Sequence, residues 1–310
     1  MSTFLVTGGA GFIGSHLCDA LVAAGDRVRV LDDLSTGRRS NLPAAATLIE
    51  GDVANPAVVA EAMDGVDGCF HLAAIASVEK GVTDWLGTHR TNITGTITVL
   101  DAIRRLGTRI PVVYASSAAV YGDAATVPIA ETEPCVPLSA YGADKYGCEL
   151  HARVAGHVHG IPTVGLRFFN VYGPRQDPKS PYSGVISVFC ERIATGRPIA
   201  IFGDGQQTRD FVHVSDVVRA LLAGMALRPA DAPVFNVCTG IATSVQALAR
   251  LIADLAGKDL HAQNQPPRAG EIRHSLGVPG LADRVLGRSE QVPLHAGLRG
   301  VLAWMTDQAR

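Results

Sequence analysis

Residues 8 to 14 read Gly-Gly-Ala-Gly-Phe-Ile-Gly, between the apolar run Phe4 to Val6 and a stretch of helical character that ends near Gly25. A strand that turns at once into a helix presents backbone amides to an anion. Glycine is needed there because a side chain would block the tight turn, the anion or the packing of helix on strand. The segment therefore predicts the first strand, turn and helix of a dinucleotide-binding fold, with the pyrophosphate against the turn.

A carboxylate at the end of the next apolar run supports this interpretation. Asp32 follows Val28, Val30 and Leu31 and lies 24 residues after Gly8. At that place a carboxylate accepts hydrogen bonds from the hydroxyls of a ribose, and it would repel a 2′-phosphate. Asp32 therefore favours NAD over NADP.

The order of the elements predicts the fold. Short β-branched runs near residues 3–7, 27–32, 47–51, 67–73, 110–116 and 162–168 alternate with stretches of helical period. Such alternation is typical of an α/β fold with a doubly wound parallel sheet, here of the Rossmann type. After residue 170 the alternation gives way to loops and mixed elements. We therefore expect an NAD-binding domain over residues 1–170, to which later segments return, and a smaller C-terminal α/β substrate-binding lobe, mainly over residues 171–310.

Composition excludes several classes of partner. The 310-residue chain has 27 basic and 29 acidic residues, and it has no basic block that would bind nucleic acid or an anionic membrane. Its six cysteines are scattered, and no histidine cluster has the spacing of metal ligands, so we expect no metal site. No apolar run approaches the ~18 residues of a membrane span, and the first strand leaves no room for a signal peptide. We expect a cytoplasmic protein with a small-molecule ligand.

A tyrosine and a lysine four residues apart point to acid–base chemistry. Tyr141 and Lys145 open a stretch rich in helix formers, so both side chains lie on one face of the expected helix. An ammonium beside a phenol favours the phenolate, which lets tyrosine act as an acid or a base well below its usual pKa of ~10. Ser116 and Ser117 follow the strand near 110–116, and Ser117 is placed to hydrogen-bond a substrate oxygen beside Tyr141.

Together these residues resemble the extended short-chain dehydrogenase/reductase family, and within it the nucleotide-sugar C4-epimerases. The resemblance covers nearly the whole chain. Besides the residues above, it is carried by these motifs: His71-Leu-Ala-Ala74, Asn92, Ser-Ser-Ala-Ala-Val-Tyr-Gly at 116–122, Leu-Arg-Phe-Phe-Asn-Val-Tyr-Gly-Pro-Arg-Gln at 166–176, Arg209-Asp-Phe211 and Arg268-Ala-Gly-Glu271.

The resemblance implies a role for each matching residue. Tyr141 would be the catalytic base, Lys145 would hold the nicotinamide ribose and lower the pKa of Tyr141, and Ser117 would align the 4-hydroxyl of the sugar. The cofactor NAD would be bound by Gly8, Gly11, Phe12, Ile13, Gly14, Asp32, Asp52, Val53, Ala73, Ala74, Asn92, Tyr141, Lys145 and Phe168. A UDP-sugar would be bound by Ser77, Ser117, Asn170, Gly184, Val185, Arg209, Arg268, Glu271 and Ser275, with the two arginines on its pyrophosphate.

The surroundings of Ser117 bear on the reaction. Similar dehydratases carry Asp-Glu directly after the catalytic hydroxyl residue, where this chain has Ala118 and Ala119, and alanine moves no proton. We therefore expect C4-epimerisation of a UDP-hexose through a transient 4-keto sugar. The alternatives are another nucleotide-sugar enzyme of the family, namely a uronate epimerase, decarboxylase, dehydratase or reductase, and, more remotely, a non-catalytic dinucleotide sensor.

Two further expectations concern the sugar and the assembly. Ser77, Gly184 and Ser275 are small and stand where similar epimerases line the sugar, which favours a pocket that accepts N-acetylhexosamines alongside or in place of plain hexoses. The helical segments 92–106 and 142–158 carry apolar residues on more than one face. Because similar epimerases pair through equivalent helices, we expect a homodimer.

Overall fold

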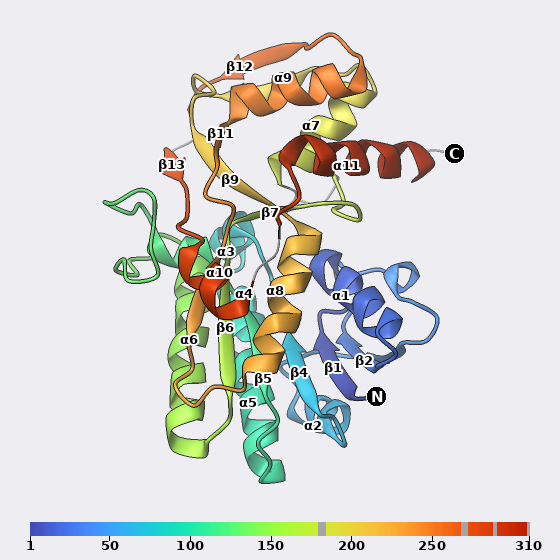
Figure 1. Ribbon diagram of the computed structural model, residues 1–310, viewed down its shortest axis with the longest axis vertical. Coiled ribbons are helices and arrows are strands. Elements are labelled where there is room, and N and C mark those ends of the chain that lie inside the picture. Colours follow the sequence, from blue (N-terminus) through green and yellow to red (C-terminus); the bar gives the residue numbers. More distant parts are fainter. Residues whose placement is uncertain (179–183, 268–271, 288–289, 309–310) are drawn as a thin grey trace.

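The computed structural model describes residues 1–178, 184–267, 272–287 and 290–308. Its centre is a sheet of seven parallel strands in the order β3-β2-β1-β4-β5-β6-β10 (Figure 1). The strands are β1 (Thr3–Thr7), β2 (Arg27–Asp32), β3 (Thr47–Glu50), β4 (Gly68–His71), β5 (Val112–Ser117), β6 (Thr163–Phe168) and β10 (Val234–Val237). The first six lie where the sequence predicts strands, so the prediction of a Rossmann-type α/β fold is confirmed.

Helices cover both faces of this sheet because successive side chains of a strand point to opposite sides. In β1, Val6 packs with α1 (Phe12–Ala23), α8 (Val214–Leu227) and α10 (Gly280–Leu286). Its neighbour Leu5 packs on the other face with α2 (Pro56–Met63), α5 (Gly95–Leu106) and α6 (Ala140–His159). Both side chains are fully buried. Because both faces of the strand are covered, its middle residues are apolar without alternation.

The strands are added in opposite directions on the two sides of the β1–β4 pair: β2 and β3 extend the sheet beyond β1, and β5 and β6 extend it beyond β4. Strands β1 and β4 pair in parallel with Thr7 opposite His71, so the turn at Gly8 and the segment after His71 leave the sheet side by side. A crevice forms at such a switch point because the connections after the two strands run to opposite faces, and ligands of open α/β sheets bind there. The architecture therefore places the predicted dinucleotide motif at the crevice.

A smaller lobe stands over the carboxyl edge of the sheet (Figure 1). At its centre β9 (Thr208–His213) pairs with β7 (Asn170–Tyr172), β11 (Ala242–Ser244) and β13 (His274–Ser275), and β8 (Ile199–Phe202) pairs with β12 (Ala262–Gln265). The helices α7 (Val185–Ala194), α9 (Val245–Ala256) and α11 (Leu294–Gln308) share a separate apolar core with these strands. Between the segments of this lobe, α8, β10 and α10 return to the main sheet.

The path from β4 to α5 has an irregular course. After the short helices α3 (Val78–Thr83) and α4 (Trp85–His89), one π-helical turn over Arg90–Thr94 (η2) leads into α5. Such turns insert an extra residue and are frequent at functional sites. The predicted helix over 92–106 thus begins inside the π turn, and the helix predicted over 142–158 corresponds to α6.

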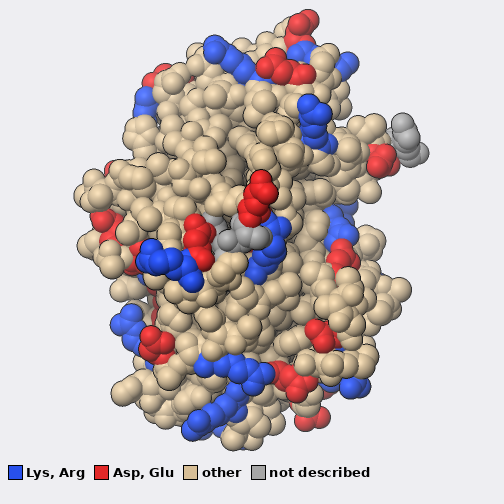
Figure 2. Space-filling model, in the orientation of Figure 1, with Lys and Arg blue, Asp and Glu red and all other residues tan. Residues whose placement is uncertain are grey.

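The surface carries charges of both signs. On the face shown in Figure 2, basic and acidic side chains are interspersed over both the main sheet and the lobe. Among the described residues, no helix combines the length and the apolar character needed to cross a membrane.

Candidate active site

The turn between β1 and α1 is built by close backbone approaches. Gly8 has a φ of +71°, and a Cβ at this residue would lie 2.7 Å from the backbone nitrogen of Ala73. A Cβ at Gly14 would lie 2.2 Å from the carbonyl oxygen of Gly8. No side chain among the described residues caps α1 at Gly11, so no protein side chain takes up the first amides of this 12-residue helix. This is a cradle for an anion, and it fits a dinucleotide pyrophosphate.

Asp32 lies at the end of β2 beside this turn. Its carboxylate accepts hydrogen bonds from the backbone N–H of Ala10 and of Leu34, each at 2.9 Å. Burial raises the pKa of the Asp32 carboxyl, and the two amide donors partly offset that effect. Each carboxylate oxygen has more than one acceptor position, so Asp32 can still receive the hydroxyls of a ribose.

Four further predicted cofactor residues lie around the same crevice. Asp52 follows β3, accepts from the N–H of Ala54 at 2.8 Å and pairs with Arg90 at 2.7 Å. Val53 is buried under α5, while Ala73 and Ala74 follow β4 and are half-buried. Ala73 also donates its N–H to the Thr7 hydroxyl at 3.2 Å. The structure therefore brings the segment after β4 directly against the glycine turn.

Tyr141 and Lys145 lie in the first two turns of α6. Ser139 caps this helix by accepting from the N–H of Gly142 at 3.0 Å. Lys145 is buried, its Nζ lies 5.9 Å from the centre of the Tyr141 ring, and it donates to the carbonyl oxygen of Ala115 in β5 at 2.9 Å. The predicted proximity of the phenol and the ammonium on one helix face is therefore present in the structure.

Ser117 ends β5 close to the start of α6. A Cβ on Gly142 would lie 2.5 Å from the carbonyl oxygen of Ala119, so the residue after Tyr141 packs directly on the turn that follows Ser117. The Ser117 hydroxyl accepts from the N–H of Ala119 at 3.2 Å and keeps its own proton to donate. Phe168 pairs with Ser117 across β5 and β6 and is buried at the same edge.

A buried ion pair ties α6 to the sheet beneath Ser117. The Arg167 guanidinium in β6 donates to both carboxylate oxygens of Glu149 in α6, at 2.9 and 2.7 Å, and Ser116 donates to the same carboxylate at 2.5 Å. Burial opposes the charge of Arg167, but Glu149 and the Tyr121 hydroxyl outweigh it and hold the pKa of Arg167 above its usual value. This pair fixes α6 relative to β5 and β6.

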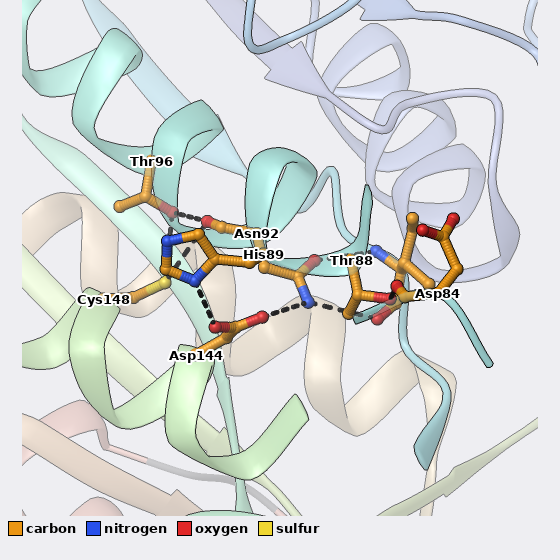
Figure 3. A network of polar contacts seen from close by, with 8 residues as sticks. Asp84, Thr88, His89, Asn92, Thr96, Asp144 and Cys148 are labelled. Carbon is orange, nitrogen blue, oxygen red and sulfur yellow. Dashed lines mark hydrogen bonds and ion pairs between the residues drawn. The ribbon is translucent and has the colours of Figure 1, made fainter. Parts of the chain in front are cut away.

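A second buried polar cluster lies between α6 and the π turn (Figure 3). Asn92 accepts from the N–H of Ile75 at 2.8 Å and donates to Asp144 at 3.4 Å, while His89 contacts Asp144 at 3.0 Å. Asn92 was predicted at the cofactor. In the structure its side-chain amide forms hydrogen bonds with the backbone of Ile75 and with Asp144. The buried His71 lies between the hydroxyls of Thr7 and Thr96, and burial lowers its pKa to about 3.

The second lobe contributes Asn170, Arg209 and Ser275. Arg209 lies in β9 opposite Ser275 of β13, so the predicted phosphate ligand and the predicted sugar-lining residue are neighbours in one sheet. Asn170 donates to the carbonyl oxygen of Asp210 in the same β9 at 3.2 Å. Arg268 and Glu271, the other half of the predicted nucleotide site, lie outside the described residues.

Ser77, Gly184 and Val185 begin helices. The buried Ser77 hydroxyl accepts from the N–H of Lys80 at 3.0 Å and caps α3. Gly184 is the residue before α7, and Val185 is the first residue of that helix. All three thus stand at the start of a helix, Ser77 at α3 and Gly184 and Val185 at α7.

Comparison with known proteins decides the family. Residues 4–238 match the NAD dependent epimerase/dehydratase family. The chain belongs to this family. The resemblance to short-chain dehydrogenases/reductases that act on nucleotide sugars is therefore confirmed, and NAD is the cofactor of the family.

Relatives within the epimerase/dehydratase family span the whole chain. The UDP-glucose 4-epimerase of Mycolicibacterium smegmatis is 37% identical over 317 residues, which cover 99% of both chains. The solved UDP-glucose 4-epimerase of Thermotoga maritima with UDP-glucose is 36% identical, with a TM-score of 0.95 over 99% of this chain and 100% of that one. The UDP-N-acetylglucosamine 4-epimerase of Methanobrevibacter ruminantium, in complex with UDP-N-acetylmuramic acid, is 34% identical, with a TM-score of 0.94 over 99% of each chain.

Several residues that build this epimerase/dehydratase site were not predicted. Asp210 is fully buried and accepts from the backbone N–H of Thr239, Gly240 and Gly277, so it joins three segments of the lobe beneath Arg209. The pair of Glu149 and Arg167 was also missed. Only half of its signal was present: Arg167 stands in an apolar run, whereas Glu149 has the charged neighbours Lys145 and Arg153 in the sequence. Among the described residues, no group of three or more His, Cys, Asp or Glu side chains is arranged to hold a metal ion.

Proposed function

We propose that this protein interconverts UDP-hexoses at C4 with tightly held NAD. The observation that carries the proposal is the placement of Tyr141 and Lys145 against the end of β5, at the carboxyl edge of an NAD-binding sheet. The residues after Ser117 are Ala118 and Ala119, so the acid and base that a dehydratase needs at this place are missing from the chain. The names of the relatives agree with an epimerase.

Separate residues of the crevice would bind separate parts of the cofactor. NAD, when bound, supplies a reversible hydride acceptor for C4 of the sugar. Gly8, Gly14 and the start of α1 would hold its pyrophosphate, and Asp32 its adenine ribose. Of the three N–H bonds of Lys145, one donates to Ala115, and the described residues offer the other two no acceptor, so they can reach a ribose hydroxyl.

Proton transfer falls to Tyr141. As the phenolate it would take the proton of the 4-hydroxyl, becoming the phenol, and it would return that proton to the oxygen after the sugar has turned over, so that no net proton is exchanged. Ser117 would donate its free hydroxyl proton to the same oxygen and align it. Lys145, held within reach of the phenol, would stabilise the phenolate by its charge.

The lobe would hold the nucleotide while the sugar turns. Arg209 suits a pyrophosphate because its planar guanidinium donates to phosphate oxygens in pairs. Ser275 lies next to it, and small residues there leave room for an acetamido group. We therefore propose both UDP-glucose/UDP-galactose and UDP-N-acetylglucosamine/UDP-N-acetylgalactosamine as substrates. The UDP-uronates are the second candidates, since the family also holds uronate 4-epimerases, one of them 31% identical to this chain.

The first test is turnover without added cofactor. Purified protein is incubated separately with UDP-N-acetylglucosamine and with UDP-glucose, and the sugars are identified by proton NMR. We expect the 4-epimer of each, with the relative rates ranking the two sugars. If NAD is present in the protein but neither epimer forms, the proposal for these substrates is wrong, and UDP-glucuronic acid is the next substrate to measure.

We also propose a homodimer formed through α5 and α6. Ile97, Leu150, Val154 and Val158 are large apolar residues of these helices with 38%, 43%, 53% and 61% of their surface exposed. A shallow groove between the two helices is lined by Ile97, Leu100, Val154 and Ala155 among others. A second copy of this face would bury these side chains. Sedimentation at micromolar concentration should give a dimer, and a monomer would refute the proposal.

The cytoplasmic location of the protein stays a prediction.

A further inference from the structure

One buried charge of the catalytic helix has no part in the chemistry described above. Asp144 stands between Tyr141 and Lys145 in the sequence, and its side chain is only 5% exposed. A buried carboxylate is costly unless hydrogen-bond donors compensate it, so its partners reveal what it organises. Its side-chain partners among the described residues, His89 and Asn92, belong to the segment around the π turn.

Two side chains of that segment face Asp144 (Figure 3). Nδ1 of His89 lies 3.0 Å from one carboxylate oxygen, and Nδ2 of Asn92 donates to the other at 3.4 Å. His89 is half-exposed, whereas Asn92 is buried. The carboxylate therefore contacts both the last residue of α4 and the middle residue of the π turn.

Asn92 passes this contact on to the backbone after β4. Its Oδ1 accepts from the N–H of Ile75 at 2.8 Å, and its Nδ2 donates to the carbonyl oxygen of Ile75 at 3.3 Å. The two N–H bonds of Nδ2 thus serve Ile75 and Asp144 together, which fixes the orientation of the amide. Ile75 leads directly to Ser77, which caps α3.

We propose that Asp144 is a positioning residue that sets, through Asn92, the backbone of Ile75–Ser77 against the catalytic helix, with His89 as its outer partner. The inference rests on the proposed function and on the expectation from the sequence that Ser77 lines the sugar. The same carboxylate that precedes Lys145 then couples the acid–base residues to one wall of the sugar pocket. Its loss should weaken sugar binding and leave the cofactor in place, because Asp32 and the glycine turn lie outside the cluster.

The test combines turnover with a readout that needs none. In Asp144→Asn, one of the two acceptor oxygens becomes an NH2 donor, so the side chain can no longer accept from His89 and from Asn92 through separate oxygens. We expect KM for the UDP-sugar to rise about tenfold, with kcat within threefold of the parent and the bound NAD, measured after denaturation, unchanged. Hydrogen exchange of the backbone over residues 74–84 should become about tenfold faster. Asp254→Asn, which changes an exposed carboxylate of α9, should alter none of these.

A second variant separates the proposed local effect from a general loss of the fold. His89→Ala removes the exposed partner only, and we expect a threefold rise in KM with the same melting temperature. Because His89 and Asn92 share the carboxylate, the double variant Asp144→Asn/His89→Ala should be no worse than Asp144→Asn alone. Unchanged exchange over residues 74–84, additive effects, or loss of bound NAD would each overturn the proposal. If the parent turns over no UDP-sugar, the proposed function fails, and the exchange result still decides the role of Asp144.

Discussion

The crevice of the main sheet and the site of the second lobe are built in different ways. In the crevice, Asp32, Lys145 and Asn92 are buried, and each is held by backbone groups of strands or loops that end at the same sheet edge. In the lobe, Arg209 and Ser275 are half-buried and lie on a short pairing of β9 with the two-residue strand β13. The protein's own contacts therefore fix the groups of the first region, as positioning for proton transfer requires. In the second region the two residues are held by a short strand pairing.

This difference separates two kinds of mutational effect. Under the proposed mechanism, changes in the crevice should lower kcat or the stability of the fold, because its groups would act on the reacting atoms or hold α6. Changes in the lobe should raise KM or alter the choice of sugar, because its groups bind ground state and transition state alike.

Removal of the phenol tests the crevice most directly. Tyr141→Phe should lower kcat by about 10³-fold, since general acid–base catalysis contributes roughly 10²–10⁴-fold. The bound NAD and the melting temperature should not change. Tyr146→Phe, on the same helix, is the matched control and should keep full turnover. Full activity of Tyr141→Phe would contradict every enzymatic role given to this site.

The buried ion pair should have the next largest effect. Glu149→Gln leaves Arg167 buried without a counter-charge, and we expect a loss of about 3–5 kcal/mol in the free energy of unfolding. Urea denaturation followed by circular dichroism measures it. The exposed pair of Arg39 and Glu50 provides the comparison, and Glu50→Gln should cost less than about 1 kcal/mol. Equal losses in the two variants would show that the pair does not anchor α6.

Replacement of Arg209 tests whether the lobe acts in substrate binding alone. Arg209→Ala should raise KM for the UDP-sugar by about 10–100-fold and leave kcat within a few-fold, because pyrophosphate binding does not change along the reaction. Steady-state kinetics and calorimetric binding of UDP measure the effect. Arg250→Ala on the exposed side of α9 should change neither. A fall in kcat without a change in KM would place Arg209 with the crevice instead.

The pH dependence of stability should reveal the buried imidazole of the crevice. His71 has a folded-state pKa of about 3, so between that value and its unfolded value near 6.5 the unfolded chain binds the extra proton. Stability is therefore lost as the pH falls below 6.5, by at most about 1.4 kcal/mol per pH unit from this group. His71→Gln should show a shallower acid slope than the parent, measured by urea denaturation from pH 7 to pH 5. The exposed His261→Gln should keep the parental slope.

The smallest expected effect concerns the sugar. Ser275→Tyr should lower turnover of UDP-N-acetylglucosamine relative to UDP-glucose by about tenfold, because bulk beside Arg209 would meet the acetamido group first. Ser275→Ala should leave the ratio unchanged. An unchanged ratio in the tyrosine variant would show that this wall of the lobe does not gate the C2 substituent.

Much of the crevice could be predicted because its residues follow strands of a regular sheet. Gly8, Asp32 and Ser117 each stand at the end of an apolar run, and parallel strands bring such ends to one edge. The strand β10 was missed, since it pairs with β6 only after the chain has left the main sheet for the lobe and returned. Asp210 was likewise beyond prediction as a structural anchor, because the amides it accepts from are about 30 and 67 residues away.

The sequence by itself determined the α/β class, the dinucleotide turn, the NAD preference and the Tyr141–Lys145 pair, because each depends on local spacing along one strand, turn or helix. Only the tertiary structure decided that Arg209 lies beside Ser275, that Glu149 neutralises Arg167 and that Asp144 reaches Ile75 through Asn92. These contacts join residues far apart in the chain. They exist because packing buries the charges and amides together, and a buried polar group must find its partner wherever the fold places one.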